Sequence, residues 1–317
     1  MNNSIKQSHI RLTPALLITL CALALYSGCS GKRMDTVGGA HIRVVATTGM
    51  VADLARAVAG TRADVTGLMG PGTDPHLYKA SQGDIGRLAE ADLILYNGLH
   101  LEGKMAEVLE KMAAHKPVVA VTDALMRDTL RAPAEFAGQY DPHVWFDVAL
   151  WSQTVGHVAE ALSAIDPAAA ASYQANAAAY RDSLTALDTW VREHIAQIPA
   201  QRRVLVTAHD AFGYFGRAYD IEVRGLQGIS TATEFGLNDI TSMVDLLVAR
   251  RIKAVFVESS VPRRSVEAVV EGCKSRGHAV IIGGELYSDA LGPADSPAGR
   301  YLGMVRHNVT TIVEALK

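Results

Sequence analysis

Three histidines and one aspartate occupy loop positions from which they could hold a metal ion together. They are His76, His143, His209 and Asp289, and each histidine comes after a predicted strand. Imidazole nitrogen and carboxylate oxygen form a common mixed ligand set for a borderline divalent cation such as Zn²⁺. A single histidine beside a strand is more often a hydrogen-bonded structural residue, so the four positions carry weight only in combination.

The pattern around these residues predicts two α/β halves. Strands are expected at 42–47, 65–69, 93–96 and 117–121, and again at 204–207, 222–226, 254–258 and 279–282. Helices are expected between them, at 50–59, 85–91, 104–114, 211–219, 238–250, 265–276 and 298–316. Such alternation is typical of parallel sheets covered by helices on both faces. Ligands bind at the carboxyl ends of such strands, so two ligands from each half would meet in a cleft.

A long helix is predicted between the halves. After a shorter helix at 148–165, apolar side chains recur every three or four positions from 172 to 198, in one stripe. At 1.5 Å per residue this helix would be about 40 Å long. The predicted fold is therefore α/β, with two lobes that each contain a mostly parallel four-stranded sheet flanked by helices, joined by one long rigid helix. The alternative is a long surface helix of one larger domain.

The N-terminal residues are predicted to be an export signal. Lys6 and Arg11 precede an apolar run at 15–26, which is too short to span a bilayer. Tyr26-Ser27-Gly28-Cys29 follows and resembles a bacterial lipobox, although Tyr26 replaces the usual leucine. We therefore predict lipidation at Cys29. The alternative is an ordinary signal peptide with an incidental cysteine.

Composition and length agree with a folded, exported protein. The chain has 317 residues, of which 49% are hydrophobic and 20% charged, and this excludes wholesale disorder. A net charge of −3 and 6% aromatic residues argue against a nucleic-acid partner. The expected organisation is a signal peptide at 1–28, a flexible tether at 29–40, an N-terminal lobe at 41–170, a linking helix at 171–199 and a C-terminal lobe at 200–317.

Four segments carry a resemblance to a known family. In chain order they are Pro75-His-Leu-Tyr78, Asp141-Pro-His-Val-Trp145, Ala208-His-Asp-Ala-Phe-Gly-Tyr-Phe215 and Leu286-Tyr-Ser-Asp-Ala-Leu-Gly292, with further matching stretches at 225–231 and 256–262. The chain resembles the cluster A-I, or TroA-like, metal-binding lipoproteins of zinc, manganese and iron ABC importers. The resemblance extends over residues 42–317.

The resemblance implies that one divalent metal ion is held between the lobes by His76, His143, His209 and Asp289. It also implies an extracytoplasmic solute-binding protein, not an enzyme, that delivers this ion to an ABC permease and its ATPase subunit. The expected protein is a monomer, anchored through lipid at Cys29 to a bacterial membrane, in the periplasm or on the cell surface.

The resemblance gives conflicting indications of whether the metal is zinc or manganese. Manganese- and iron-selective members commonly have glutamate at the position of His209, whereas zinc-selective members usually have histidine. Zinc-selective members often also have a histidine-rich loop, but 122–140 contains no histidine, and Glu258-Ser-Ser-Val resembles the manganese or mixed branch. Three imidazoles favour Zn²⁺ in affinity, while a bidentate Asp289 would suit five-coordinate Mn²⁺. The prediction ranks zinc first, manganese second and iron third.

Five acidic residues could orient the imidazoles: Asp74, Asp141, Asp147, Asp210 and Glu258. The first four could equally serve as turn, cap or surface acids. Metal affinity is expected to fall steeply below about pH 6, as the histidines protonate.

Three other functions fit parts of the pattern. A zinc-dependent hydrolase could use Glu258 as general base, but four protein ligands leave no open position for water, and no His-Glu-x-x-His motif is present. A surface adhesin would suit the lipid anchor equally well. A siderophore or cobalamin binder would need an open cleft lined by aromatic residues or arginine.

Overall fold

The computed structural model describes residues 41–136, 138–232 and 236–317. Within it, His41–Lys317 forms one compact unit. The predicted signal peptide, the tether and Cys29 lie outside the described residues. No helix among the residues that the structure describes is both long and apolar enough to cross a membrane.

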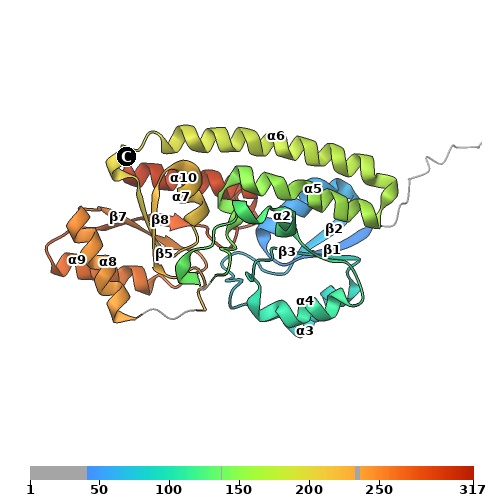
Figure 1. Ribbon diagram of the computed structural model, residues 1–317, viewed down its shortest axis with the longest axis horizontal. Coiled ribbons are helices and arrows are strands. Elements are labelled where there is room, and N and C mark those ends of the chain that lie inside the picture. Colours follow the sequence, from blue (N-terminus) through green and yellow to red (C-terminus); the bar gives the residue numbers. More distant parts are fainter. Residues whose placement is uncertain (1–40, 137, 233–235) are drawn as a thin grey trace, which may run out of the picture. The chain divides into compact units, whose positions relative to one another are not determined.

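The first half contains one parallel sheet with helices on both faces (Figure 1). Its strands are β1 (Ile42–Ala46), β2 (Ala63–Gly67), β3 (Leu93–Tyr96) and β4 (Val118–Ala120), in the order β2-β1-β3-β4. Helices α2 (Gly49–Ala59) and α5 (Val148–Ile165) cover one face, and α3 (Gln82–Glu90) and α4 (Ala106–Ala113) cover the other. The buried strands therefore contribute side chains to two apolar clusters, one on each face.

Short polar caps explain where the helices of this half begin. The hydroxyl of Thr48 accepts the N–H of Val51 at the start of α2, and α2 ends before Gly60, whose φ is 59°. Ser81 and Asp84 form a reciprocal capping box at the start of α3. The end of α2 at Ala59 is as the sequence predicts, whereas α3 begins three residues before the predicted start at 85.

The second half contains two hydrogen-bonded pairs of parallel strands. Strand β5 (Val204–His209) pairs with β6 (Glu222–Gln227), and β7 (Ala254–Glu258) pairs with β8 (Ile281–Leu286). Strand β5 lies beside β7, so the four strands follow one another as a layer. Helices α7 (Gly213–Tyr219), α8 (Leu237–Arg250), α9 (Arg264–Ser275) and α10 (Tyr301–Leu316) flank them. The α/β class with parallel sheets and flanking helices is confirmed, although the expected second sheet divides into two ladders.

The long helix is also confirmed, as α6 (Ala170–Ile195), which has 26 residues. At 1.5 Å per residue it is about 39 Å long. Its buried stripe runs from Tyr173 to Ile195 and packs on α2, α5 and α10, so α6 contacts both halves (Figure 1). The residues of this stripe belong to an apolar cluster that extends from β1 to α10. The division into lobes at 170 and 199 remains a prediction.

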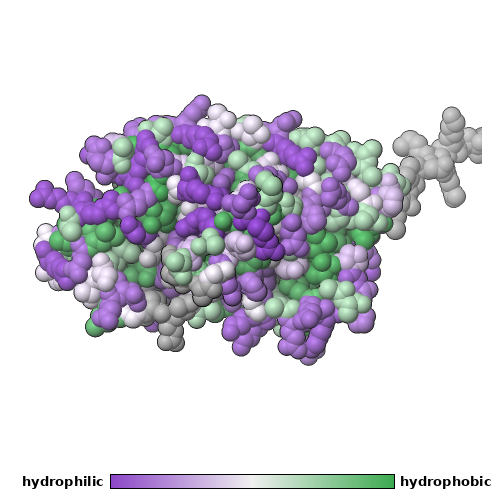
Figure 2. All heavy atoms as spheres, in the orientation of Figure 1, coloured by the Kyte–Doolittle hydropathy of each residue, from purple (hydrophilic) through white to green (hydrophobic). Residues whose placement is uncertain are grey.

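The side of the molecule drawn in Figure 2 is largely hydrophilic, with small apolar patches between charged side chains. The outer side of α6 carries exposed polar residues such as Asp182 and Glu193, as an amphipathic surface helix requires.

Candidate metal centre

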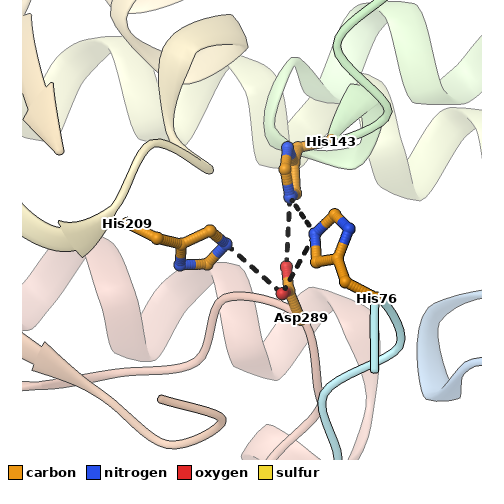
Figure 3. A group of neighbouring side chains, drawn as sticks. All are labelled: His76, His143, His209 and Asp289. Carbon is orange, nitrogen blue, oxygen red and sulfur yellow. Dashed lines mark hydrogen bonds and ion pairs between the residues drawn. The ribbon is translucent and has the colours of Figure 1, made fainter. Parts of the chain in front are cut away.

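The four residues predicted to bind metal meet in one buried cluster (Figure 3). Their side chains come from four loops or strand ends, two in each half of the chain. The three histidines and Asp289 are all at most 4% exposed. One ligand atom from each residue lies within 4.8 Å of the others. The geometry therefore brings together all four sequence-predicted ligands.

Three of the four residues lie at the end of a strand or in the loop that follows one. His76 lies in the loop between β2 and α3, and Asp289 lies in the loop after β8. His209 is the last residue of β5, so this strand extends two residues further than the sequence pattern predicts. His143 departs from the expected setting, because a long segment with several 3-10 turns separates it from β4. It directly precedes the 3-10 helix Val144–Phe146.

Four separations in the cluster, measured to both oxygens of Asp289, are close to the edge length of a coordination tetrahedron. Asp289 Oδ1 is 3.3 Å from His143 Nε2, and Asp289 Oδ2 is 3.3 Å from His209 Nε2 and 3.6 Å from His76 Nε2. The Nε2 atoms of His76 and His143 are 3.3 Å apart. With metal–ligand bonds of about 2.0–2.1 Å, a regular tetrahedron has edges of about 3.4 Å. The side chains thus already have the spacing that a small divalent cation needs.

His143 is held by a carboxylate on the side of the ring away from the cluster. Asp141 Oδ1 accepts the backbone N–H of His143 at 3.0 Å and lies 2.8 Å from its Nδ1. Arg131 contacts the other oxygen of Asp141. The carboxylate therefore holds the Nδ1 proton and leaves Nε2 free to bind a cation.

Glu258 holds His209 in the same way. Its Oε1 accepts the backbone N–H of His209 at 2.8 Å, and its Oε2 lies 2.6 Å from His209 Nδ1. Gly225 on β6 allows the backbone to approach closely here, because a Cβ at this position would lie 2.5 Å from the N atom of Asp210. Both carboxylate oxygens of Glu258 are engaged by one histidine, so Glu258 is not available as a general base.

The other three acidic candidates have different roles. Asp74 accepts the backbone N–H of His76 at 2.9 Å, so it holds this ligand through its main chain and not through its ring. Asp147 caps helix α5 by accepting the N–H of Leu150. Asp210 contacts none of the three rings through a hydrogen bond among the described residues. Asp141 and Glu258 are therefore the two acids that orient imidazoles.

Burial and charge set the protonation of the cluster in opposite directions. Burial lowers the pKa of His76 to about 3, so this ring is neutral at pH 7. Burial also lowers the pKa of His143, but the hydrogen bond to Asp141 and the nearby charge of Asp289 outweigh it and raise the value to about 9. His209 likewise has a pKa raised well above its usual value, because Glu258 and Asp289 outweigh burial. The two imidazoles in turn hold the pKa of Asp289 well below its usual range, against the effect of its burial.

The formal charges suit a divalent cation. Arg131 balances Asp141, and the carboxylates of Glu258, Asp289 and Asp74 supply negative charge near a bound cation once the imidazoles are neutral. Both oxygens of Asp289 are buried without a hydrogen-bond partner of good geometry. Buried carboxylates in such a position are typically paired with cations. The cluster therefore has the charge, the donor atoms and the orphaned oxygens of a cation site.

Two contacts near the cluster were not assigned a role from sequence. Trp145 Nε1 donates to the carbonyl of Ser288 at 3.1 Å, and the hydroxyl of Tyr301 donates to the carbonyl of Trp145 at 2.7 Å. The first ties the segment of His143 to the loop of Asp289, and the second ties it to the start of α10. Trp145 lies in the motif of His143 and Ser288 in that of Asp289, so the sequence could have indicated a role for both. Nothing in the sequence singled out Tyr301.

Comparison with known proteins identifies the family. The family model for ZnuA, the zinc-uptake complex component A, periplasmic, matches residues 44–315. The chain belongs to the ZnuA family. It is thus a metal-binding lipoprotein, the solute-binding component of an ABC transporter and not an enzyme.

Several individual ZnuA-family relatives are similar over nearly their whole length. The chain is 49% identical over 306 residues to the manganese-binding lipoprotein MntA of Bacillus subtilis (strain 168). The matched region covers 96% of this chain and 99% of that protein. It is 46% identical over 304 residues to the zinc-binding protein TroA of Treponema pallidum (strain Nichols), and the matched region covers 94% of this chain and 98% of that protein. It is 31% identical over 313 residues to the manganese ABC transporter substrate-binding lipoprotein PsaA of Streptococcus pneumoniae serotype 4, covering 96% and 99%.

The fold agrees with this assignment to the ZnuA family. The solved structure of the periplasmic zinc-binding protein TroA from Treponema pallidum superposes with a TM-score of 0.85 at 48% identity, over 87% of this chain and 99% of that one. The predicted resemblance is therefore confirmed, and with it an extracytoplasmic, periplasmic type of binding protein.

Proposed function

We propose that this protein captures Zn²⁺ as cargo through His76, His143, His209 and Asp289. The observation that carries the proposal is the cluster itself, in which three Nε2 atoms surround a buried carboxylate at 3.3–3.6 Å. Three imidazoles and one carboxylate bind Zn²⁺ more tightly than Mn²⁺ in a site of this kind, following the Irving–Williams order. Four protein ligands leave the ion no open position for a reacting water, as suits carriage more than catalysis.

Manganese is the second candidate for the cargo. The similarity to the manganese-binding lipoprotein MntA, at 49% identity, slightly exceeds that to the zinc-binding protein TroA, at 46%. Asp289 has both oxygens directed at the histidines, and bidentate binding by this residue would give five-coordination. Mn²⁺ tolerates that geometry better than a closed tetrahedron. Iron is third, since no relative above carries it in its name.

Delivery to the membrane follows from the same proposal. The protein would act as a monomer, dock on an ABC permease that works with its ATPase subunit, and release the ion there. Lipid at Cys29, followed by the tether at 29–40, would hold it to a bacterial membrane, in the periplasm or on the cell surface. Labelling with radioactive palmitate, with Cys29→Ser as control, tests the anchor, and equal labelling of the two proteins would refute it.

Competitive loading tests the metal. The full chain is stripped with chelator, offered equimolar Zn²⁺ and Mn²⁺ without oxygen, and analysed for bound elements beside His209→Glu. We expect one zinc per chain in the wild type and a shift toward manganese in the variant, because an oxygen ligand replaces an imidazole. One manganese in the wild type would transfer the proposal to the second candidate. Binding of neither metal would refute capture altogether.

A further inference from the structure

One hydrogen bond joins the loop of His76 to the second half of the chain outside the four-residue cluster. The hydroxyl of Thr231 donates to Asp74 Oδ2 at 2.6 Å. The other oxygen of Asp74 accepts the backbone N–H of His76 at 2.9 Å. Within 41–136, 138–232 and 236–317, no other hydrogen bond or ion pair crosses from this loop to the second half, apart from that of His76 with Asp289. A single carboxylate thus fixes the main chain of a ligand and ties it to the opposite half.

Thr231 is itself connected to the strands that carry His209. The side-chain amide of Gln227 donates to the carbonyl of Thr231 at 2.8 Å. Gln227 is the last residue of β6 and lies opposite His209 in the register of β5 and β6. The position of the Thr231 hydroxyl is therefore set by the same strand pair that positions a ligand from the second half.

His76 depends on this connection more than the other two histidines do. The rings of His143 and His209 are each held at Nδ1 by a carboxylate, at 2.8 Å and 2.6 Å. Among the described residues no carboxylate contacts Nδ1 of His76, whose ring is engaged only at Nε2, within the cluster (Figure 3). His76 is also the most exposed of the four, at 4%. Its place in the site is therefore fixed largely through its main chain.

We propose that the Asp74–Thr231 hydrogen bond is a latch that holds the His76 loop across the site and sets the rate at which the metal ion leaves. The proposal rests on the metal-capture function proposed above. While the bond is made, His76 stays within reach of the ion. When it breaks, the loop moves away with His76, and water takes the place of the fourth ligand. Asp74 and Thr231 are positioning residues, because neither belongs to the ligand set.

The test is the rate of zinc dissociation from the loaded full-length protein, measured by rapid mixing with excess chromogenic chelator. Thr231→Val removes the hydroxyl at nearly constant volume, and we expect dissociation to become about tenfold faster, as for loss of a hydrogen bond to a charged group. Thr231→Ser keeps the hydroxyl and should remain within about twofold of the wild type. The control is Thr241→Val, which removes an exposed hydroxyl bonded to the carbonyl of Leu237 within α8.

A second variant distinguishes loss of this hydrogen bond from a general disturbance of the structure by the substitution. Asp74→Ala should accelerate dissociation at least as much as Thr231→Val, and the double variant should be no faster than Asp74→Ala, because both changes remove the same bond. An unchanged rate in Thr231→Val would overturn the latch, and so would a Thr231→Ser rate as fast as that of Thr231→Val.

Zinc stoichiometry, measured first, separates the two proposals. Failure of the wild type to bind one ion would refute capture and the latch together. One ion per chain with equal rates in wild type and Thr231→Val would refute the latch alone.

Discussion

At the scale of single residues, the site is controlled by carboxylates behind the imidazoles as much as by the ligands. Asp141 and Glu258 each accept the backbone N–H of one histidine and contact Nδ1 of its ring, Asp141 through a hydrogen bond and Glu258 through a close ion-pair contact. This double contact fixes the tautomer and the direction of Nε2 at once. His143 and His209 are thus preorganised, and the ion needs to order fewer groups when it binds.

We expect Asp141→Asn to weaken zinc affinity by roughly 10- to 100-fold, because the amide carries no charge to support the Nδ1 proton of His143 or to pair with Arg131. Asp147→Asn is the matched control. It makes the same substitution six residues away, at a helix cap where asparagine works as well as aspartate. Competition with a chelator of known affinity measures both. Equal affinities in the two variants would contradict the role given to Asp141.

Metal binding at pH 7 should release about two protons, since His143 and His209 both have raised pKa values and each must lose the proton on Nε2. Affinity should accordingly rise with pH from 7 toward 9, the pKa of His143. The sequence-based expectation of a loss below about pH 6 assumed ordinary imidazoles, whereas the raised pKa values predict that the loss begins at higher pH. Calorimetry in buffers of different ionisation enthalpy counts the protons. A count near zero would show that the rings are already neutral.

The four residues that cluster could be predicted from sequence, but their supporting residues could be predicted only as a set. His76, His143, His209 and Asp289 each lie in a distinctive motif. Nothing along the chain tells which of five acids faces which ring, because that depends on how distant loops meet. Thr231 lies in a matching stretch, yet its partner Asp74 is 157 positions away.

At the scale of elements, most helix and strand boundaries could be predicted to within about three residues. The end of α5 before Asp166-Pro167 is as expected, because proline cannot continue a helix. Strand β8 was expected at 279–282 and is found at Ile281–Leu286. Its Gly283-Gly284 pair has poor strand propensity, and pairing with β7 determines its true extent. Tertiary pairing of this kind leaves no local trace in the sequence.

The buried stripe of α6 should matter for stability and not for the ligand set. Leu187 is fully buried against the core that both halves share. We expect Leu187→Ala to lower the free energy of unfolding of the metal-free protein by about 2–5 kcal/mol, while one zinc per chain still binds. Thr185→Ala, on the exposed side of the same helix, should change it by less than about 0.5 kcal/mol. Urea unfolding measures both, and similar losses in the two variants would contradict the assigned packing.

At the scale of the whole molecule, the ion should act as a bridge between the two halves. Two ligands come from each, so binding is coupled to the native arrangement of both. Free zinc at 100 times its dissociation constant should stabilise the protein by about 2.7 kcal/mol and raise Tm by roughly 5 °C or more. His76→Ala should lose most of this shift. Scanning calorimetry with and without zinc measures it, and an equal shift in the variant would place the ion elsewhere.

Anomalous diffraction from crystals of the zinc-loaded protein, recorded on both sides of the zinc absorption edge, would show whether one divalent ion is held by His76, His143, His209 and Asp289. We expect one strong peak about 2.0–2.2 Å from three Nε2 atoms and the carboxylate of Asp289. A peak that excludes any of these residues, or none within the cluster, would contradict this expectation.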